Sequence, residues 1–475
     1  MSSCPYDDSR IHAALEEITG PQGILTAAED LESYVRDQRG KYHGRACAVV
    51  FPRSTEEVSR IVRFCSNEGI GMVPQGGNTG LVGGSVPDES GREIILSLKR
   101  MNRIRAMDSE NFTLTVEAGC ILQDIQNAAA EADRLFPLSL GAEGTCQIGG
   151  NLSTNAGGVQ VLRYGNARDL VLGLEVVLAD GRIWNGLRGL RKDNTGYDLK
   201  QLFLGAEGTL GIITAAVLKL YARPREIVTA LATVPDPDSA VSLLSRLRTA
   251  SGESVTSFEL MPARGIEFAC RHIEGCRNPL DAPSPWYVLL ELFGGREGSD
   301  LSETLQEAFG ACLEEGLVQD AVLAQNESQR RELWRLREGL VEAQKHEGAS
   351  IKHDVSVPVS EVPAFLAEAT KIVTDLVEGA RPVPFGHLGD GNIHFNISQP
   401  EGMDPRAFLA RWDEVNRHVH DVVARLGGSI SAEHGIGQLK REENMRFKSE
   451  VEIDLMRSLK YALDPEDLMN PGKLV

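Results

Sequence analysis

The chain has 475 residues, which is more than one compact hydrophobic core usually holds, so we expect two or three domains. Hydrophobic residues make up 42% and charged residues 25% of the sequence, a composition that is typical of a folded globular protein and argues against disorder. The formal net charge of −19 argues against nucleic acid and anionic membranes as partners, because both carry negative charge.

Eight cysteines are scattered along the chain without a Cys-x-x-Cys pair. This spacing argues against a zinc ribbon or an iron–sulfur cluster and is typical of free thiols in a reducing compartment. Residues 1–8 show no basic segment followed by an apolar run, and no apolar run approaches the roughly 18 residues that cross a bilayer. We therefore expect a soluble, cytoplasmic protein.

Residues 1–45 predict an N-terminal helical segment. From residue 46 to residue 224, short strands rich in Val, Ile and Leu alternate with helical patterns. A helix is predicted to begin after Ser54, because Ser54 is a good N-cap and Glu57 stands at the capping-box position. Two strands are predicted further along this region, at 114–118 and 174–178.

Two glycine-rich runs lie about seventy residues apart, at 74–81 and 144–158. Glycine accepts positive φ and lets the backbone approach a ligand, and successive backbone N–H groups form a nest for phosphate oxygens. Two such runs, each beside a strand-like segment, predict one extended dinucleotide between them. The sequence has neither Gly-x-Gly-x-x-Gly nor Gly-x-x-x-x-Gly-Lys-Ser/Thr, so a Rossmann turn and an NTP-hydrolysing P-loop are not supported.

A break at Pro224 separates a second region, residues 225–425, in which strands and helices alternate again. Residues 426–475 predict a mostly helical C-terminal segment. The pattern as a whole indicates an α+β protein with four parts, namely 1–45, 46–224, 225–425 and 426–475.

His387 and His394 flank a Gly-Asp-Gly-Asn sequence that is typical of a tight turn. The turn would bring the two imidazoles together on neighbouring strands, which is a candidate arrangement for a divalent metal. Glu433 offers a third ligand, and the adjacent His434 a base, because neighbouring side chains leave the backbone in different directions. The same residues can be explained without a metal. His387 and His394 could be hydrogen-bonded strand residues, and Glu433 and His434 could form an ordinary helix cap, so the residues alone leave both interpretations open.

Residues 48–222 resemble the flavin domain of the vanillyl-alcohol oxidase/p-cresol methylhydroxylase superfamily. The segments that carry the resemblance are 48–52, 69–81, 140–158 and 204–214. It implies a two-subdomain FAD-binding domain, an α+β substrate domain and a C-terminal segment that packs back on the FAD domain. Since residues 75–80 contain no histidine, it implies non-covalent FAD. The residues that it places around FAD are Pro74, Gln75, Gly76, Gly77, Asn78, Thr79, Gly80, Leu81, Leu140, Gly141, Gly144, Thr145, Ile148, Gly149, Asn151, Thr154, Asn155, Gly157, Gly158, Glu207, Gly208, Ile212 and Asn470.

Residues 334–338 and 352–358, together with the two histidine motifs, resemble the substrate domain of FAD-dependent D-2-hydroxy acid dehydrogenases, nearest to the D-2-hydroxyglutarate branch. The resemblance implies one divalent metal, usually zinc, and a catalytic base, His434. Val341 occupies a position where some 2-hydroxyglutarate enzymes carry Thr, which weakens the contact expected with the distal carboxylate. The implied metal ligands are His387, His394 and Glu433, and the implied substrate-binding residues are Arg337, Lys352, Asn396 and Val341.

The implied reaction is the metal-assisted oxidation of D-2-hydroxyglutarate to its 2-oxo acid by hydride transfer from Cα to flavin N5, with D-malate as a further candidate. Arg337 would anchor the C1 carboxylate, and His434 would remove the hydroxyl proton. A dicarboxylate needs a second, distal cation, for which Lys352 is the candidate.

Other functions stay open at this point. A D-lactate or glycolate dehydrogenase of the same family needs no distal cation. A metallohydrolase would use His434 to activate a metal-bound water, and a non-catalytic FAD-binding module would leave the histidines without a role. No nicotinamide site is visible, so we expect an electron-transfer flavoprotein or a quinone as the electron acceptor, with oxygen as an open option. A homodimer is one option for the oligomeric state.

Overall fold

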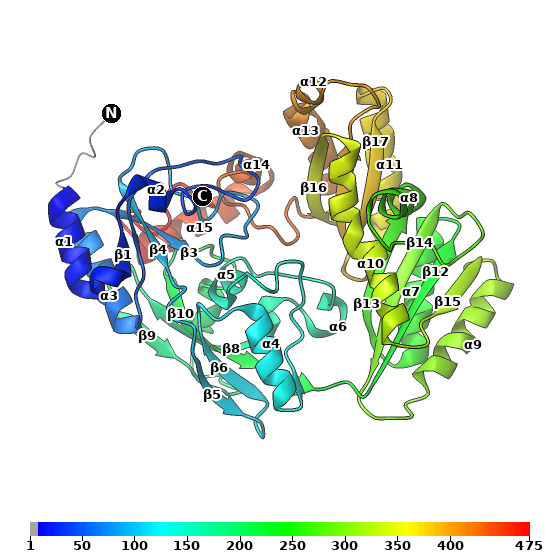
Figure 1. Cartoon of the computed structure of the whole chain (residues 1–475), viewed down its shortest axis with the longest axis horizontal. Helices are drawn as coiled ribbons and strands as arrows, with labels where there is room; N and C mark the ends of the chain where they lie inside the picture. Colours follow the sequence, from blue (N-terminus) through cyan, green and yellow to red (C-terminus); the bar gives the residue numbers. More distant parts are fainter. Residues whose placement is uncertain (1–7) are drawn as a thin grey trace. The chain divides into compact units, whose positions relative to one another are not determined.

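The computed structural model describes residues 8–475, which form two compact units (Figure 1). Unit 1 comprises the residues up to 156, residues 166–222 and residues 433–475, and unit 2 comprises residues 157–165 and 223–432. Residues 1–7, where the predicted N-terminal segment begins, lie outside the described part of the chain. The C-terminal segment therefore belongs to the same unit as the N-terminal half.

The first sheet of unit 1 has four strands, in the order β1 (Ile24–Leu25), β2 (Ala46–Val50), β4 (Glu93–Ser97) and β3 (Gly71–Gln75). β2, β4 and β3 run parallel, whereas β1 pairs antiparallel with β2. Helix α3 (Thr55–Glu68) connects β2 to β3 and begins where the sequence predicts, because the Ser54 side chain accepts a hydrogen bond from the backbone N–H of Glu57.

The N-terminal segment is only partly helical. It holds α1 (Asp8–Thr19) and the short α2 (Ala28–Leu31), but it also supplies strand β1. The strand forms because Ile24 and Leu25 extend the sheet beside Val50 and Val49 of β2. The prediction of a helical segment over the whole of residues 1–45 was therefore wrong for this stretch.

The second sheet of unit 1 is antiparallel, in the order β5 (Ile104–Asp108), β6 (Thr113–Glu117), β10 (Ile212–Lys219), β8 (Val171–Val177) and β9 (Ile183–Gly186). β6 and β8 are the two strands predicted at 114–118 and 174–178. A two-stranded sheet pairs β11 (Tyr221–Ala222) with β7 (Arg134–Leu135). The short helices beside these sheets are α4 (Leu122–Glu131) and α5 (Ile148–Ser153).

The C-terminal segment forms α14 (Arg441–Phe447) and α15 (Glu450–Leu463) and then lies against β3. Met469 forms a parallel bridge with Met72, and the backbone N–H of Asn470 donates to the Met72 carbonyl at 2.8 Å. Lys460 fixes this end of the chain, because its Nζ donates to the carbonyls of Met469 at 2.8 Å and Thr209 at 3.0 Å.

Unit 2 is built on one antiparallel sheet with the strand order β15-β12-β14-β13-β17-β18-β16. Their bounds are β15 (Asp320–Leu323), β12 (Glu226–Val234), β14 (Trp286–Gly294), β13 (Val255–Pro262), β17 (Arg381–His387), β18 (Asn392–Ser398) and β16 (Ser350–Ser356). Its helices are α6 (Val161–Tyr164), α7 (Pro237–Ser251), α8 (Ala263–His272), α9 (Leu301–Glu314), α10 (Glu327–Ala343), α11 (Val362–Leu376), α12 (Pro405–Leu409) and α13 (Trp412–Arg425).

Helices cover both faces of this sheet. α10 packs on one face, where its Leu333, Leu336 and Leu340 join a buried cluster with Leu289 and Phe385 of the strands. α11 packs on the opposite face, where Phe365 meets Phe395 edge-on with ring centroids 5.5 Å apart. Because side chains alternate along a strand, the residues next to Phe395 point toward the α10 face.

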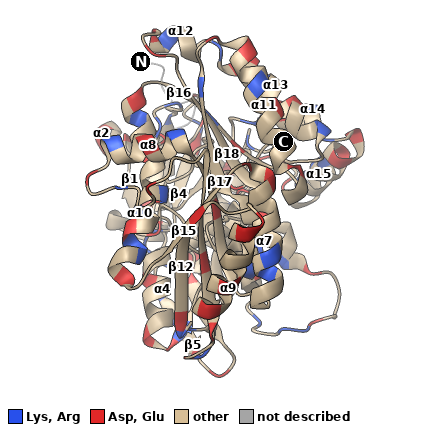
Figure 2. Cartoon of the chain, turned by 90° about the vertical axis from the view of Figure 1, so that its right-hand side faces the viewer, with Lys and Arg blue, Asp and Glu red and all other residues tan. Residues whose placement is uncertain are grey.

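Acidic and basic residues are interspersed on the helices of unit 2 that face the viewer in Figure 2. On α10, for example, Glu327 pairs with Arg330 at 3.3 Å and with Arg331 at 3.1 Å. Among residues 8–475, none of the helices is both long enough and apolar enough to span a bilayer.

Candidate functional site

The two glycine-rich runs meet within unit 1. A Cβ atom on Gly77 would lie 2.1 Å from the carbonyl oxygen of Thr145 and 3.0 Å from Cα of Cys146, so only glycine fits there. In contrast, a Cβ on Gly80 or Gly144 would meet no atom within 4 Å. Some glycines thus let the two loops pack together, while others leave the backbone open to a ligand, which fits a dinucleotide cradle.

Two asparagines set the shape of these loops. Asn78 and Asn155 adopt left-handed backbone conformations with φ of 53° and 50°. The Asn78 amide donates to the carbonyl of Arg36 at 2.9 Å, and the Asn155 oxygen accepts from the backbone N–H of Arg168 at 2.9 Å. The side chains of Asn78 and Asn155, which were predicted to line the cofactor, therefore use these hydrogen bonds to fix the shape of the loops.

Among the described residues of unit 1, the buried side-chain oxygens without a hydrogen-bond partner in the protein include three in or beside the predicted cofactor motifs: Gln147 Oε1, Asn151 Oδ1 and Asn470 Oδ1. A buried acceptor without a donor costs about 1–3 kcal/mol, so a bound molecule that donates to these oxygens would stabilise the site. Asn151 and Asn470 are predicted cofactor residues. Gln147 was not selected from the sequence, although it lies inside the second glycine-rich run.

Glu207 links the third predicted cofactor motif to the C-terminal segment. Its Oε1 accepts from the backbone N–H of Ile436 at 2.7 Å and its Oε2 from that of Gly437 at 2.8 Å. The Asn470 amide donates to the carbonyls of Glu207 at 2.7 Å and Gly84 at 2.9 Å. Burial raises the pKa of Glu207, although the two backbone N–H groups oppose that effect.

The other predicted cofactor residues follow the same loops. Pro74 and Gln75 end β3, and the Gln75 amide donates to the carbonyls of Tyr34 and Ser85. The rest of this set comprises Gly76, Thr79, Leu81, Leu140, Gly141, Thr145, Ile148, Gly149, Thr154, Gly208 and Ile212 in unit 1, and Gly157 and Gly158 in unit 2.

In unit 2 the short helix α6, which follows Gly158, packs beside the turn between the two predicted metal-binding histidines. A Cβ on Gly389 of this turn would lie 2.7 Å from Cδ2 of Leu162. Gly391 adopts φ of 81°, and a Cβ there would lie 2.0 Å from the carbonyl oxygen of Val357. The turn therefore requires both glycines, as its sequence predicts.

The register of the sheet puts the predicted polar residues on one face. Lys352 of β16 lies opposite Asn396 of β18, and Asp354 lies opposite His394. His387 ends β17 opposite Asn392. Because Asn392, His394 and Asn396 are two residues apart, they share the face that α10 covers. The rings of His387 and His394 lie 5.4 Å apart, edge to face.

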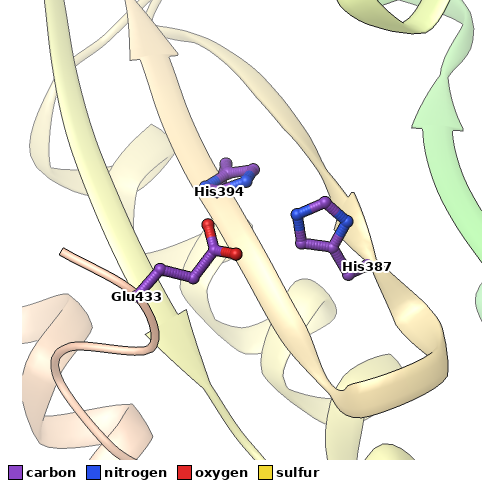
Figure 3. Close-up of side chains that lie close together, drawn as sticks. All are labelled: His387, His394 and Glu433. Atoms are coloured by element: carbon purple, nitrogen blue, oxygen red, sulfur yellow. The ribbon is translucent and has the colours of Figure 1, made fainter. Parts of the chain in front are cut away.

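One ligand atom each of His387, His394 and Glu433 lies within 4.8 Å of the others (Figure 3). Glu433 directly follows Ala432, whose N–H donates to the Asp354 carbonyl at 3.3 Å, so this chain segment is fastened to β16. Two imidazoles and a carboxylate are a common donor set for a divalent ion such as zinc, so the residues fit the predicted metal.

A second group of donor atoms shares Glu433. Asp354, Glu433 and His434 also offer one ligand atom each within 4.8 Å of one another. The side chains of Glu433 and His434 therefore do not diverge fully, although they are adjacent in the sequence. Asp354 is buried and lies 3.8 Å from Nδ1 of His394.

A buried carboxylate, Glu259 of β13, connects two predicted site residues. Its Oε1 lies 2.6 Å from Nδ1 of His387, and its Oε2 accepts from Nε of Arg337 on α10 at 2.6 Å. Burial opposes ionisation, but the charges of His387 and Arg337 outweigh it and lower the pKa of Glu259 to about 2. Because Glu259 meets the Nδ1 side of the His387 ring, a metal ion would be held through Nε2.

Arg337 is buried, with its guanidinium 4.8 Å above the ring of Phe385. Val341, one turn further along α10, is 47% exposed. Lys352 is half-buried and Asn396 is buried. Glu259 was missed from the sequence, although a single acidic residue in an otherwise uncharged strand (residues 255–262) was a usable signal.

Comparisons with known proteins agree with this arrangement. A family described as "FAD binding domain" matches residues 46–186, and one described as "FAD linked oxidases, C-terminal domain" matches residues 223–474. An Oryza sativa subsp. japonica protein named "Probable D-2-hydroxyglutarate dehydrogenase, mitochondrial" is 41% identical over 461 residues, which are 97% of this chain and 80% of that protein. This chain belongs to the FAD-binding D-2-hydroxy acid dehydrogenases.

Two further members of this family are similar along most of their length. The D-2-hydroxyglutarate dehydrogenase of Xanthomonas citri pv. viticola is 38% identical, over 98% of this chain and 97% of that protein. A Schizosaccharomyces pombe protein named "Putative D-lactate dehydrogenase C713.03, mitochondrial" is 39% identical, over 97% of this chain and 89% of that protein.

The fold of this family member also resembles that of p-cresol methylhydroxylase. The structure of that enzyme with substrate bound superposes with a TM-score of 0.77 at 18% identity, over 98% of this chain and 96% of that chain. The predicted α+β fold of the vanillyl-alcohol oxidase type and the predicted FAD-dependent dehydrogenase are confirmed.

Proposed function

We propose that the protein oxidises D-2-hydroxyglutarate to its 2-oxo acid with the help of FAD and a divalent metal ion. The observation that carries the proposal is the convergence of His387, His394 and Glu433 on one point beside the polar face of the unit 2 sheet. Two relatives of about 40% identity, named for this reaction, support the choice of substrate. D-Malate, a shorter dicarboxylate, is the second substrate that we propose.

When bound, FAD supplies a two-electron acceptor, and a divalent ion supplies a Lewis acid for the substrate hydroxyl. The protein's own residues bind and orient the hydroxy acid. His387 and His394 would hold the ion with Glu433, and Arg337 would face the C1 carboxylate with its terminal nitrogens, because its Nε is taken by Glu259. His434 would accept the hydroxyl proton, a role that an imidazole can fill as a general base.

The preference for a dicarboxylate rests on Lys352. It lies across the strand pair from Asn396, on the same face as His394, so a second cation is available beside the proposed metal. The alternative substrate is D-lactate, which the S. pombe relative's name supports. Val341 also favours a smaller substrate, because an exposed valine cannot donate a hydrogen bond to a distal carboxylate.

For reoxidation we propose an electron-transfer flavoprotein or a quinone, since the sequence has no nicotinamide-binding motif. This choice can be tested by following decay of the reduced flavin on addition of ubiquinone, electron-transfer flavoprotein or oxygen.

The function is tested by mixing the purified protein anaerobically with D-2-hydroxyglutarate, D-malate or D-lactate and following the flavin absorbance, with and without chelator. We expect fast bleaching by the two dicarboxylates that is lost after metal removal. Bleaching by D-lactate alone would select the alternative, and equal bleaching after complete metal removal would contradict metal assistance.

A further inference from the structure

Glu259 contacts both a predicted metal ligand, His387, and a predicted substrate-binding residue, Arg337. It lies in β13 directly opposite His387 of β17, and its side chain is fully buried. Each carboxylate oxygen serves one partner, Oε1 the imidazole of His387 and Oε2 the guanidinium of Arg337.

A carboxylate in such a place is costly unless charged or hydrogen-bonded partners surround it. The neighbours of Glu259 along the strand, Phe258 and Leu260, are buried apolar residues, so the sheet itself gains nothing from a charge here. Phe385 adds a second restraint, because the Arg337 guanidinium stacks over its ring. The negative charge of Glu259 therefore serves to hold its two partners, His387 and Arg337.

We propose that Glu259 is a positioning residue that holds His387 and Arg337 in their working orientations at the same time. Resting on the proposed function, this inference links the metal site to the substrate carboxylate site through one side chain. By accepting the Nδ1 proton of His387, Glu259 would fix the tautomer that presents Nε2 to the ion. By binding Nε of Arg337, it would turn both terminal nitrogens of the guanidinium away from itself and toward the substrate.

A matched control lies in the same sheet. Glu291 of β14 is also buried and also pairs with an arginine of α10, since Nε of Arg330 lies 2.6 Å from its Oε1. Its other partners are Nε1 of Trp334 at 2.7 Å and the hydroxyl of Thr229 at 2.7 Å. Glu291 thus resembles Glu259 in burial and in ion pairing, but it contacts no histidine in the described structure.

The test compares Glu259→Gln with Glu291→Gln in the FAD-loaded protein. Zn²⁺ binding is measured by equilibrium dialysis with metal analysis, and folding is checked by circular dichroism. Glutamine keeps the shape of the side chain, but it is uncharged and has only one oxygen, so it cannot accept hydrogen bonds from both His387 and Arg337. We expect the Zn²⁺ dissociation constant to rise about 10- to 100-fold in Glu259→Gln and to stay at the wild-type value in Glu291→Gln. The shorter but charged Glu259→Asp should recover part of the affinity.

The second readout is the KM for D-2-hydroxyglutarate at saturating Zn²⁺, which reports on Arg337 alone. We expect it to rise about tenfold or more in Glu259→Gln and to remain unchanged in Glu291→Gln. Equal losses in the two variants would mean that Glu259 only stabilises the fold and would overturn the inference, as would wild-type values in Glu259→Gln. If Glu259→Gln does not fold, the same test is made with Glu259→Asp and Glu291→Asp. The two variants are compared by the Zn²⁺ dissociation constant and by the KM for D-2-hydroxyglutarate.

Failure of the inference and failure of the proposed function give different results. A wild-type protein that binds Zn²⁺ through His387 but is bleached by no hydroxy acid would contradict the function and leave the role of Glu259 at His387 intact. A wild-type protein that is bleached by D-2-hydroxyglutarate but binds no Zn²⁺ would overturn the inference and retain the oxidation.

Discussion

The Glu207 carboxylate accepts a hydrogen bond from the backbone N–H of Gly437 at 2.8 Å, across 230 residues of sequence. The neighbouring N–H of Ile436 binds the other oxygen. Both N–H groups belong to the turn that immediately follows His434, the proposed base. A motif that the sequence relates to FAD therefore also fixes the chain that carries the proposed base.

Glu207→Gln should lower turnover while FAD stays bound. The amide has only one oxygen, so one of the two backbone N–H groups loses its acceptor in a buried place, at a cost of about 1–3 kcal/mol. The turn after His434 is then held by one bond, and we expect kcat to fall about tenfold. Steady-state kinetics and the ratio of flavin to protein absorbance check this.

The contrasting outcome for Glu207→Gln is loss of FAD with normal turnover in the molecules that retain it. That result would mean that Glu207 serves the cofactor directly, as the family resemblance implies, and that the turn needs no second bond. Glu131→Gln, at an exposed position on α4, serves as the control and should change neither quantity.

Gly77→Ala and Gly144→Ala should separate folding from cofactor binding. The Cβ at position 77 collides with Thr145, so this variant must shift one of the two loops and should lose about 1–3 kcal/mol of stability together with FAD. The Cβ at position 144 meets no protein atom. We expect Gly144→Ala to fold normally without FAD and to bind FAD about tenfold more weakly, because the methyl group occupies ligand space.

Thermal unfolding of the FAD-free proteins and titration with FAD measure both quantities for these glycine variants. Unchanged FAD affinity in Gly144→Ala would contradict the proposed cradle. A normal melting temperature in Gly77→Ala would contradict the close packing of the two loops.

Lys352→Met should change substrate preference. If Lys352 binds the distal carboxylate, its loss removes a charge-assisted hydrogen bond, and we expect the KM for D-2-hydroxyglutarate to rise about tenfold or more with little change for D-lactate. Lys345→Met is the matched control, because Lys345 is exposed and pairs with Glu342. An equal rise of KM for both substrates would mean that Lys352 does not bind the distal carboxylate specifically.

Local sequence signals predicted much of this architecture. Ser54 caps α3 because its hydroxyl reaches an N–H three residues away, and the histidine turn needs Gly389 and Gly391 for contacts within a few ångströms. The proximity of the His387 and His394 rings follows from a short hairpin, whose register is largely fixed by its turn. Interactions of this kind are encoded in adjacent residues.

Contacts between distant parts of the chain could not be predicted in the same way. Glu259 reaches His387 across 128 residues and Arg337 across 78, and no spacing rule connects them. The resemblance placed Arg337 at the substrate and Glu207 at FAD, but it did not show that each has a hydrogen-bonded partner within the protein. Packing of strands and helices decides these contacts.

Glu117→Gln tests the electrostatics of unit 1 through pH. Glu117 is buried on β6, where Arg103 and Arg105 bind its carboxylate. Burial opposes ionisation, yet the hydrogen bonds and charges of the two arginines outweigh it and lower the pKa of the carboxyl. A carboxyl with a lowered pKa contributes stability above its unfolded pKa and loses it as pH falls through the folded pKa.

The free energy of unfolding of Glu117→Gln should therefore lie about 2 kcal/mol below that of the wild type at pH 7. The gap should narrow as pH falls below about 4, the ordinary range of a glutamate pKa, because the carboxyl of the unfolded wild-type chain is protonated there while the folded carboxyl, with its lowered pKa, is still ionised. Urea unfolding of both proteins at several pH values measures this difference in the free energy of unfolding. A gap that stays constant from pH 7 to pH 3 would show that the variant loses packing rather than the ionised hydrogen bonds, since packing does not depend on protonation.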